Sequence, residues 1–233
     1  MAKKLNSLSV FFPAFNDAQS IPILIKDVFK ILPRMADQYE VIVVNDGSTD
    51  NTAKVLKRLS HTYSKLKIIT HNYNQGYGGA LKSGFRAAQF DYVFYTDGDG
   101  QYDPKELPAL VEKMNEGIDL VNGYKIKRHD PWIRIIIGEL YSLWVRLLLG
   151  IRLADVDCDF RLFNKKILEK INLQSNSGAI CAEMLLQVQK NNGIITSVPV
   201  HHYPRIYGSS QFFHPMRIIR SIFEDLKLWF FEK

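Results

Sequence analysis

The stretch Asp91-Tyr-Val-Phe-Tyr-Thr-Asp97-Gly-Asp99-Gly-Gln101 decides how this chain of 233 residues is interpreted. An apolar run ends there in two carboxylates, one residue apart, and an amide follows. A buried strand ending at this point would deliver Asp97 and Asp99 to the crevice where open α/β sheets bind ligands. Gly98 and Gly100 allow the chain to bend, so the two side chains need not diverge. Two carboxylates and an amide suit Mg²⁺ or Mn²⁺ held jointly with substrate phosphates, whereas an acidic turn is the structural alternative.

The residues around this stretch predict an α/β fold. Helices of about ten to fifteen residues alternate with apolar runs, which indicates a mostly parallel central sheet. Pro13 is expected to end the first strand, and Ser20 to cap the helix that follows. Because the carboxyl ends of parallel strands meet at one edge, Asp17 and Asp46 should lie near Asp97. The expected strands of this half are residues 8–12, 40–45, 67–71, 92–96 and 119–123.

The pattern changes after residue 125. Residues 132–153 are typical of a long apolar helix, too charged to span a membrane, that packs on the core or lies at a membrane surface. An amphipathic, aromatic helix is expected at 214–230. Pro199 indicates that the last strand is an edge strand. The other elements expected in this half are strands at 159–163 and 196–203 and helices at 165–171 and 182–191.

Composition limits the function. Lys and Arg number 30 against 24 Asp and Glu, and the net charge of +6 is compatible with an anionic partner. The basic residues gather in the second half, away from the acidic strand ends, which fits phosphorylated substrates better than a nucleic-acid surface. Cys158 and Cys181 form neither a metal-ligand pair nor a disulfide framework. There is no apolar signal core and no uncharged apolar run of about 18 residues, so we expect no membrane-spanning helix.

A glycine loop, Gly76-Tyr-Gly78-Gly79, follows the third expected strand and opens a helix through Ala88. It is not the Gly-x-Gly-x-x-Gly dinucleotide signature, which follows a first strand, and no Gly-x-x-x-x-Gly-Lys-Ser/Thr occurs. We expect these glycines to allow close packing of helix on sheet and to let a helix N-terminus approach a ligand.

Ordered motifs run along most of the chain. The first half contains Pro13-Ala-Phe15-Asn-Asp17, Val44-Asn-Asp46-Gly-Ser-Thr-Asp-Asn-Thr, Asn74-x-Gly76-x-Gly-Gly-Ala and Asp97-Gly98-Asp99-Gly-Gln101. These resemble family 2 glycosyltransferases with the GT-A fold, a Rossmann-like sheet flanked by helices. The later motifs are similar to the polyprenyl-phosphate (dolichol-phosphate) sugar synthase branch, and the resemblance extends over roughly residues 7–212. They are Asp159-Phe-Arg161-Leu-Phe, Val198-Pro-Val and Arg205-x-x-Gly-x-Ser210.

The resemblance implies a role for each matching position. The first loop and Asp46 would hold the nucleotide, and Arg205 with Ser210 would close over the phosphates. Divalent metal, Mg²⁺ or Mn²⁺, would be bound by Asp97, Asp99 and Gln101. There are three departures from the family pattern. Asp17 replaces the usual Glu, and Gln211 stands where many relatives have Lys. Gly123-Tyr-Lys125 replaces the usual Gly-Ser-Arg. The residues expected to bind substrate are Pro13, Ala14, Phe15, Asp17, Asp46, Gly76, Asp97, Gly98, Lys125, Arg128, Arg134 and Ser210.

Sugar transfer from a nucleotide builds negative charge on the leaving diphosphate, which a metal ion and a cationic side chain stabilise. In-line attack on the opposite face inverts the anomeric centre. A lipid phosphate is largely a dianion at pH 7, by analogy with phosphoserine, and needs no strong base, whereas a hydroxyl acceptor needs a carboxylate. Asp157 and Asp159 are the candidate bases and Glu183 is a third, although Asp159 can equally pair with an arginine. The expected catalytic residues are Asp99, Asp157, Asp159, Arg161 and Arg205.

The leading hypothesis is an inverting, metal-dependent hexosyltransferase that moves a sugar from a UDP- or GDP-sugar to a polyprenyl (dolichyl or undecaprenyl) phosphate. It would act at the cytoplasmic face of a membrane, as a peripheral protein without a nucleic-acid partner. The alternatives are transfer to a saccharide or protein hydroxyl in cell-envelope polysaccharide synthesis, and a non-catalytic sugar-nucleotide-binding protein. We expect a glycosyltransferase domain at 1–212, with a nucleotide-binding half (1–124) and an acceptor-binding half (125–212). The helix at 213–233 would dock on a membrane, form a homodimer or pack on the domain.

Overall fold

The structure is a computed structural model that describes residues 4–115, 117–128, 132–153, 155–207 and 215–232. Within these residues, seven strands form one sheet. The strands are β1 (Leu5–Ala14), β2 (Ala36–Asn45), β3 (Leu66–Thr70), β4 (Tyr92–Thr96), β5 (Leu120–Arg128), β6 (Phe160–Asn164) and β7 (Ile195–His202). The helices are α1 (Ile21–Met35), α2 (Thr52–Thr62), α3 (Tyr77–Ala87), the 3₁₀ turn η1 (Pro104–Glu106), α4 (Leu107–Lys113), α5 (Trp132–Leu149), α6 (Lys165–Leu168), α7 (Ile180–Lys190) and α8 (Pro215–Glu232).

The strands lie in the order β3-β2-β1-β4-β6-β5-β7, and among the described strands β6 alone runs against the others. The predicted α/β fold with a mostly parallel central sheet is therefore confirmed, and β7 forms the edge that Pro199 indicated. The chain leaves β1 toward β2 and β3 on one side and returns to β4 on the other. Such a switch point opens a crevice outside the carboxyl ends of the two strands, where α/β proteins bind ligands.

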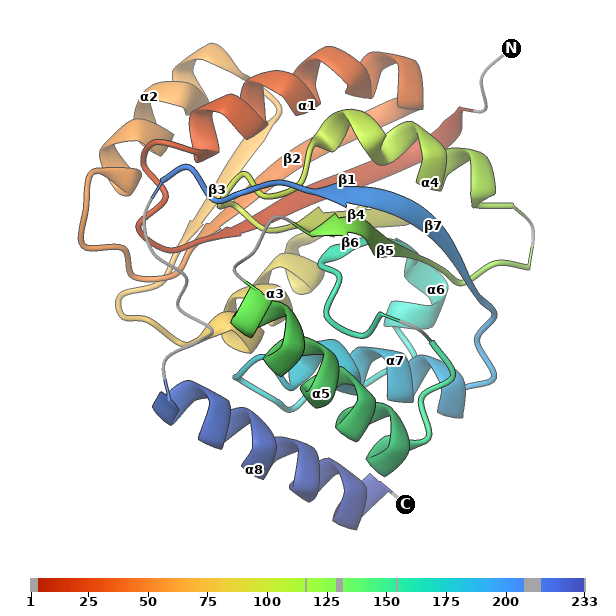
Figure 1. Ribbon diagram of the computed structural model, residues 1–233. Coiled ribbons are helices and arrows are strands. Elements are labelled where there is room, and N and C mark those ends of the chain that lie inside the picture. Colours follow the sequence, from red (N-terminus) through yellow and green to blue (C-terminus); the bar gives the residue numbers. More distant parts are fainter. Residues whose placement is uncertain (1–3, 116, 129–131, 154, 208–214, 233) are drawn as a thin grey trace.

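Helices cover both faces of the sheet (Figure 1). The core beneath α1, α2 and α4 contains Phe12 and Val43, and the core beneath α3, α5, α6, α7 and α8 contains Phe11 and Val44. Neighbouring residues of one strand thus enter opposite cores, as the two-residue period of a strand requires. Burial on both faces explains why β1 and β2 appear in the sequence as continuous apolar runs.

The expectations for the end of β1 and the start of α1 were wrong. Pro13 does not end β1, which continues to Ala14, and Pro13 lies in register with Val44 of β2. Ser20 precedes α1 but makes no capping hydrogen bond with its side chain. Its hydroxyl donates instead to the Gly98 carbonyl at 2.7 Å. Both residues thereby serve the junction between β1 and the loop after β4.

The helix α8 lies beside α5, at the bottom of Figure 1. The Tyr141 hydroxyl of α5 donates to Asp225 Oδ2 of α8 at 2.6 Å. Asp225 and Leu228 are buried, whereas Phe223 and Phe230 are exposed, so the predicted amphipathic character of the C-terminal helix is confirmed. None of the helices in the described ranges combines the length and the apolar character that crossing a bilayer requires.

The contact between α5 and α8 is predicted to make stability depend on pH. Burial raises the pKa of Asp225 to about 7, although the Tyr141 hydroxyl lowers it, and the charge of Asp157 raises it further. Because the folded-state pKa is higher than the unfolded one, stability present near pH 4 is lost as the pH rises toward 7. Asp225→Asn removes this loss, so we expect it to raise the free energy of unfolding at pH 8 by roughly 2–4 kcal/mol, at about 1.4 kcal/mol per pH unit.

Urea unfolding of wild type and Asp225→Asn at pH 5 and pH 8 measures this effect. The stability difference between the two proteins should be much smaller at pH 5 than at pH 8. Asp37→Asn, at an exposed position where the side chain pairs with Lys4 at 2.6 Å, serves as the control for loss of a surface carboxylate. An Asp225→Asn protein that is no more stable than wild type at pH 8 would contradict the assignment.

Candidate active site

The carboxyl ends of β1 and β4 approach each other with no room for a side chain between them. The Gly98 amide donates to the Pro13 carbonyl at 3.1 Å. A Cβ atom on Gly98 would lie 2.5 Å from that same oxygen, so no larger residue fits without a shift of the backbone. Gly100 has φ +80°, a conformation that favours glycine. The loop Asp97–Gln101 is therefore held directly against the loop that follows β1.

Arg205, in the segment after β7, bridges these two loops. Its Nη2 donates to Asp17 Oδ1 at 3.2 Å, and its Nη1 lies 3.3 Å from Asp99 Oδ2. The Nε atom donates to the Tyr207 carbonyl at 2.8 Å, which fixes the guanidinium to its own segment. The Arg205 side chain is only 18% exposed. Three segments that are distant in the sequence thus meet around one guanidinium, and the predicted phosphate-binding role of Arg205 stays a prediction.

The carboxylates at this edge are destabilised in their charged form. Burial raises the pKa of Asp17 to about 6, although a backbone amide and Arg205 lower it in part. Burial also raises the pKa of Asp97 well above its ordinary value, and the charges of Asp159 and Asp99 add to the effect. The pKa of Asp99 is raised by burial as well, and Arg205 partly offsets this. Carboxylates crowded in a poorly solvated space favour a cation between them.

Two tyrosine hydroxyls orient the acidic side chains. Tyr77, the first residue of α3, donates to Asp97 Oδ1 at 2.7 Å, and Tyr95 of β4 lies 3.1 Å from Asp159 Oδ1. Burial raises the pKa of both hydroxyls well above the ordinary value, so both remain protonated donors. Neither tyrosine was predicted to belong to the site. A usable signal is that a buried tyrosine hydroxyl needs a partner, and Tyr95 lies two residues before Asp97 on a buried strand.

Asp46 is engaged with groups of the protein itself. Its Oδ1 accepts from His71 Nδ1 at 2.6 Å and from the Gln75 amide at 2.8 Å, and its Oδ2 accepts from the Gly76 amide at 3.1 Å. The side chain is almost completely buried. Asp46 therefore holds the glycine loop against the end of β2. Its predicted contact with the nucleotide stays a prediction, and so does that of Gly76.

The structure corrects the interpretation of Arg161. The sequence predicts that Arg161 takes part in acceptor binding and catalysis, but its side chain is fully buried. Its Nε donates to Asn122 Oδ1 at 2.8 Å, its Nη1 to the Cys181 carbonyl at 3.2 Å, and its Nη2 to the Val156 carbonyl. The guanidinium satisfies acceptors from three other segments because β6 lies inside the sheet, between β4 and β5. Arg161 thus holds the segment that precedes β6 from within.

The loop before β6 carries the two candidate bases. Burial raises the pKa of Asp157 to about 6, and the charge of Lys125 lowers it in part. Lys125 Nζ donates to the Asp157 carbonyl at 2.7 Å, and only 6% of the lysine side chain is exposed. Asp159 accepts at Oδ1 from the Cys181 thiol at 3.1 Å as well as from Tyr95. Lys125, a predicted substrate-binding residue, thus anchors this loop.

Other predicted site residues are placed less directly. The side-chain Nε2 of Gln101 donates to the Tyr203 carbonyl at 3.1 Å, and its backbone amide donates to Asp99 Oδ1 at 3.0 Å. Gln101 therefore joins the loop after β4 to the end of β7. Its role as a metal ligand stays a prediction. Ser210 lies outside the described residues, as do the side chains of Arg128 and Arg134.

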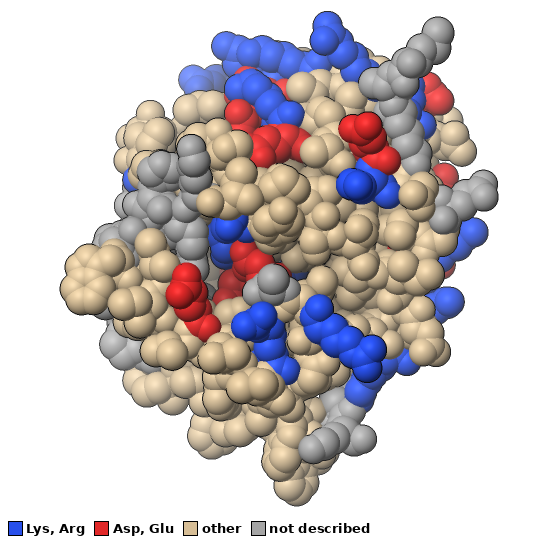
Figure 2. All heavy atoms as spheres, turned by 45° about the vertical axis from the view of Figure 1, so that its right-hand side comes forward, with Lys and Arg blue, Asp and Glu red and all other residues tan. Residues whose placement is uncertain are grey.

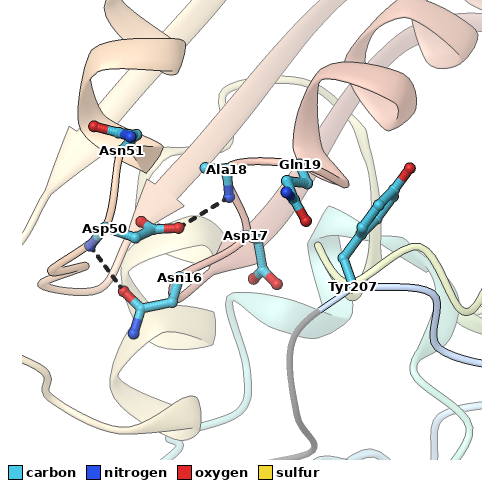
Figure 3. A pocket seen from close by; sticks show the side chains of 7 residues that line it. All are labelled: Asn16, Asp17, Ala18, Gln19, Asp50, Asn51 and Tyr207. Atoms are coloured by element: carbon cyan, nitrogen blue, oxygen red, sulfur yellow. Dashed lines mark hydrogen bonds between the residues drawn. The ribbon is translucent and has the colours of Figure 1, made fainter.

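A pocket of about 320 Å³ opens beside the loop after β1 (Figure 3). Figure 3 shows the Tyr207 ring across the pocket from this loop, and Asp50 beside Asn16. The Asp50 amide donates to Asn16 Oδ1 at 3.3 Å, and Asn16 has φ +60°, which asparagine tolerates better than most residues. The pocket lies next to the predicted nucleotide loop. Its lining consists of Asn16, Asp17, Ala18, Gln19, Asp50, Asn51 and Tyr207.

The sheet order and this acidic switch point define an α/β protein with a candidate ligand site at the ends of β1 and β4. Residues 9–172 match the family described as glycosyl transferase family 2. This match covers well over half of the chain, which therefore belongs to glycosyl transferase family 2. The chain is also 30% identical over 211 residues to undecaprenyl-phosphate 4-deoxy-4-formamido-L-arabinose transferase from Proteus mirabilis (strain HI4320). That alignment covers 90% of this chain and 64% of the relative, so the chain spans less than two thirds of the relative's length.

Solved structures share the fold. A crystal structure of glucosyl-3-phosphoglycerate synthase from Mycobacterium tuberculosis in complex with Mn²⁺, UDP and glucosyl-3-phosphoglycerate has a TM-score of 0.73 at 20% identity, over 96% of this chain and 80% of that chain. The complex of that synthase with Mn²⁺ and UDP-glucose has a TM-score of 0.72 at 20% identity, over 94% and 79% of the two chains. The predicted GT-A architecture is thereby confirmed.

The Arg205 bridge is predicted to stabilise the protein more at high pH than at low pH. Arg205→Ala leaves Asp17 and Asp99 buried without their opposite charge, which should cost about 1–3 kcal/mol at pH 8. As the pH falls to 5, Asp17, whose pKa is already about 6 in the wild type, binds a proton and the cost should shrink. Guanidinium chloride unfolding at the two pH values measures the difference. Arg205→Lys keeps a charge and should lose less stability at pH 8, and equal losses for Arg205→Ala at both pH values would argue against the bridge.

Proposed function

We propose that this protein is an inverting glycosyltransferase that moves a sugar from a UDP- or GDP-sugar to a polyprenyl phosphate. The observation that carries the proposal is the guanidinium of Arg205 bridging Asp17 and Asp99 at the switch point. A diphosphate with its cation has the charges needed to replace these contacts, since the phosphates attract Arg205 and the cation attracts Asp99. Membership of glycosyl transferase family 2 and the similarity to an undecaprenyl-phosphate transferase support the same reaction.

Asp97 and Asp99 fit a divalent cation such as Mg²⁺ or Mn²⁺. Both are oxygen ligands whose pKa values are raised by burial, so a cation would relieve an existing repulsion. Among the described residues, no group of three or more His, Cys, Asp or Glu side chains is arranged to hold a metal ion by itself. Mg²⁺ is commonly held by one or two carboxylates together with substrate phosphates. Such an ion would neutralise charge that grows on the leaving diphosphate.

The residues of the chain supply the rest of the donor site. Arg205 would stabilise the developing charge on the diphosphate, and removal of one comparable donor costs about 2.7–4 kcal/mol elsewhere. The pocket beside Asp17 supports a role of the loop after β1 in holding the nucleotide. Figure 2 shows acidic side chains inside a hollow of the molecule, with Lys and Arg side chains near its lower rim. This distribution of charge suits a phosphorylated ligand that binds together with a metal ion.

The acceptor would bind beside the loop before β6. A lipid phosphate has a second pKa of about 6, by analogy with phosphoserine, so at neutral pH it attacks without a base. A second candidate function, transfer to a saccharide or protein hydroxyl, is favoured by one observation: burial raises the pKa of Asp157 to about 6. A carboxylate of that pKa is suited to accept a proton near neutral pH. The solubility of the labelled product distinguishes the two acceptor classes.

A lipid acceptor requires contact with a bilayer, and we propose that α5 and α8 make it, at the cytoplasmic face. The exposed apolar residues recur at helical spacing on both helices, which forms one apolar stripe on each. Leu147 and Phe223 are 76% and 73% exposed. The two helices are neighbours at the bottom of Figure 1, so their stripes can face one membrane surface. The stripes comprise Trp132, Ile136, Leu140, Leu143 and Leu147 of α5 and Met216, Ile219, Phe223, Leu226 and Phe230 of α8.

Asp99→Asn tests the catalytic proposal. In the wild type, the Gln101 backbone amide donates to Asp99 Oδ1 at 3.0 Å. Asparagine keeps an oxygen that can accept this hydrogen bond, but it removes the negative charge. Transfer should therefore fall roughly 10²–10³-fold, as for loss of one stabilising group in other enzymes, while thermal stability is kept. The assay uses Mn²⁺, radiolabelled UDP- and GDP-sugars and undecaprenyl phosphate. Asp103→Asn, in the same loop, is the control; full activity of Asp99→Asn, or no organic-extractable label from any donor in wild type, would refute the proposal.

Membrane contact is tested by placing charge on the apolar stripes. Leu147→Glu and Phe223→Glu should each weaken binding to vesicles of phosphatidylethanolamine and phosphatidylglycerol by about tenfold or more, since burial of one such side chain contributes about 1.5–3 kcal/mol. Co-sedimentation measures the bound fraction. Ile23→Glu is the matched control, because Ile23 is also exposed but lies on α1, on the opposite face of the sheet. Equal vesicle binding by all three variants would contradict the proposed surface.

A further inference from the structure

Two glutamates hold a short segment that no sequence motif marks. The amides of Gln174 and Ser175 donate to Glu183 of α7 at 2.7 and 2.9 Å. The next two amides, of residues 176 and 177, donate to Glu224 Oε2 of α8 at 3.2 and 3.0 Å. Four consecutive backbone N–H groups, residues 174–177, are thus each bound by a carboxylate. Glu183 is fully buried and its oxygens are engaged here, which removes the basis for its role as third candidate base.

Glu224 of α8 makes further contacts besides those with the two backbone amides. Its Oε2 also accepts from the Ser177 hydroxyl at 2.7 Å, and its Oε1 accepts from Arg220 at 3.1 Å. Burial acts to raise the pKa of Glu224, but the hydrogen bonds from Ser177 and the contact with Arg220 outweigh it and lower the pKa. The carboxylate is therefore charged at neutral pH, and its hydrogen bonds are of the stronger, charge-assisted kind.

The clamped segment supports the glycine loop directly. The Gly78 amide donates to the Asn176 carbonyl at 3.1 Å. A Cβ atom on Gly78 would lie 2.3 Å from the Ser175 carbonyl oxygen, and one on Gly76 would lie 2.5 Å from the Asn176 oxygen. Backbone therefore rests on backbone, and no flexible side chain lies between them to absorb a displacement. A shift of residues 175–176 must move the start of α3.

The start of α3 carries groups of the donor site. Gly76 donates its amide to Asp46, and Tyr77 donates its hydroxyl to Asp97 at 2.7 Å. The residues on both sides of Tyr77 are thus held, by Asp46 at Gly76 and by residue 176 at Gly78. Contacts run without interruption from Glu224 of α8, through residues 176–177 and the start of α3, to the Asp97 carboxylate.

We propose that Glu224 is a positioning residue of the donor site, which sets the orientation of Asp97 through the 174–177 segment and Tyr77. The inference rests on the proposed function, because it takes Asp97 to bind the metal–diphosphate group. It gives α8 a second role besides membrane contact. The apolar outer face of α8 lies in the same helix as Glu224, so movement of α8 at a lipid surface would reach the donor site.

Glu224→Ala is expected to weaken binding of Mn²⁺ with UDP or GDP by roughly 2- to 30-fold, the range for residues that act through a contact network. Isothermal titration calorimetry measures this binding without turnover. Glu224→Gln retains an acceptor oxygen and should restore most of the affinity. Lys227→Ala, at an exposed position of the same helix, is the control that should match wild type. A Glu224→Ala protein that loses thermal stability but binds like wild type would mean that Glu224 only anchors α8, and would overturn the proposal.

A double-mutant cycle with Tyr77→Phe tests the route. If Glu224 acts through Tyr77, the loss of affinity in the double variant should be clearly smaller than the product of the two single losses, because coupled residues are not additive. Fully multiplicative losses would overturn the route through Tyr77. Failure of the wild type to bind either nucleotide with Mn²⁺ would instead refute the proposed function itself, so the two failures are distinguishable.

Discussion

The bridge from Arg205 to Asp17 and Asp99 is the interaction on which the arrangement of the site depends. Carboxylates at adjacent strand ends repel one another, and burial makes their charged forms still less favourable. One guanidinium with several donors in a fixed plane can serve two carboxylates at once, which a lysine cannot do as well. Arg205 therefore allows acidic residues to follow both β1 and β4, whose carboxyl ends lie side by side. The same bridge brings the segment after β7 over the crevice, from the far edge of the sheet.

The carboxylates at this edge differ in how many hydrogen bonds they accept from groups of the protein. Asp46 accepts three hydrogen bonds from the chain, which is the pattern of a structural carboxylate. Asp97 and Asp159 each accept at one oxygen from a tyrosine hydroxyl. A tyrosine hydroxyl orients a carboxyl group without bringing a positive charge to it, so the repulsion among the acids is left for a cation to relieve. The fold thus fixes the orientation of these side chains and leaves room for a cation to stabilise them.

Much of the sheet could be predicted from the sequence, because β1, β2 and β4 are buried on both faces and appear as apolar runs that end in polar loops. The reversal of β6 could not, since the apolar pattern of residues 160–163 is the same in either direction. Arg161 gave no sign of burial, because arginine is almost never fully buried unless it is paired, and its acceptors come from three separate segments. The bridge between Arg205 and Asp17 joins residues 188 positions apart, and only the resemblance to a family pointed to that loop.

The reversal of β6 has a consequence for how this architecture can diversify. β5 runs toward the ligand edge and β6 starts from it, so the chain between them leaves the sheet and returns at the same edge. The acids before β6 and the helix α5 both belong to this excursion. Its length and composition can change without altering the register of any strand. Evolution could therefore exchange the part of the protein proposed to meet the acceptor as a single insertion, while the strands β1 to β4 stay unchanged.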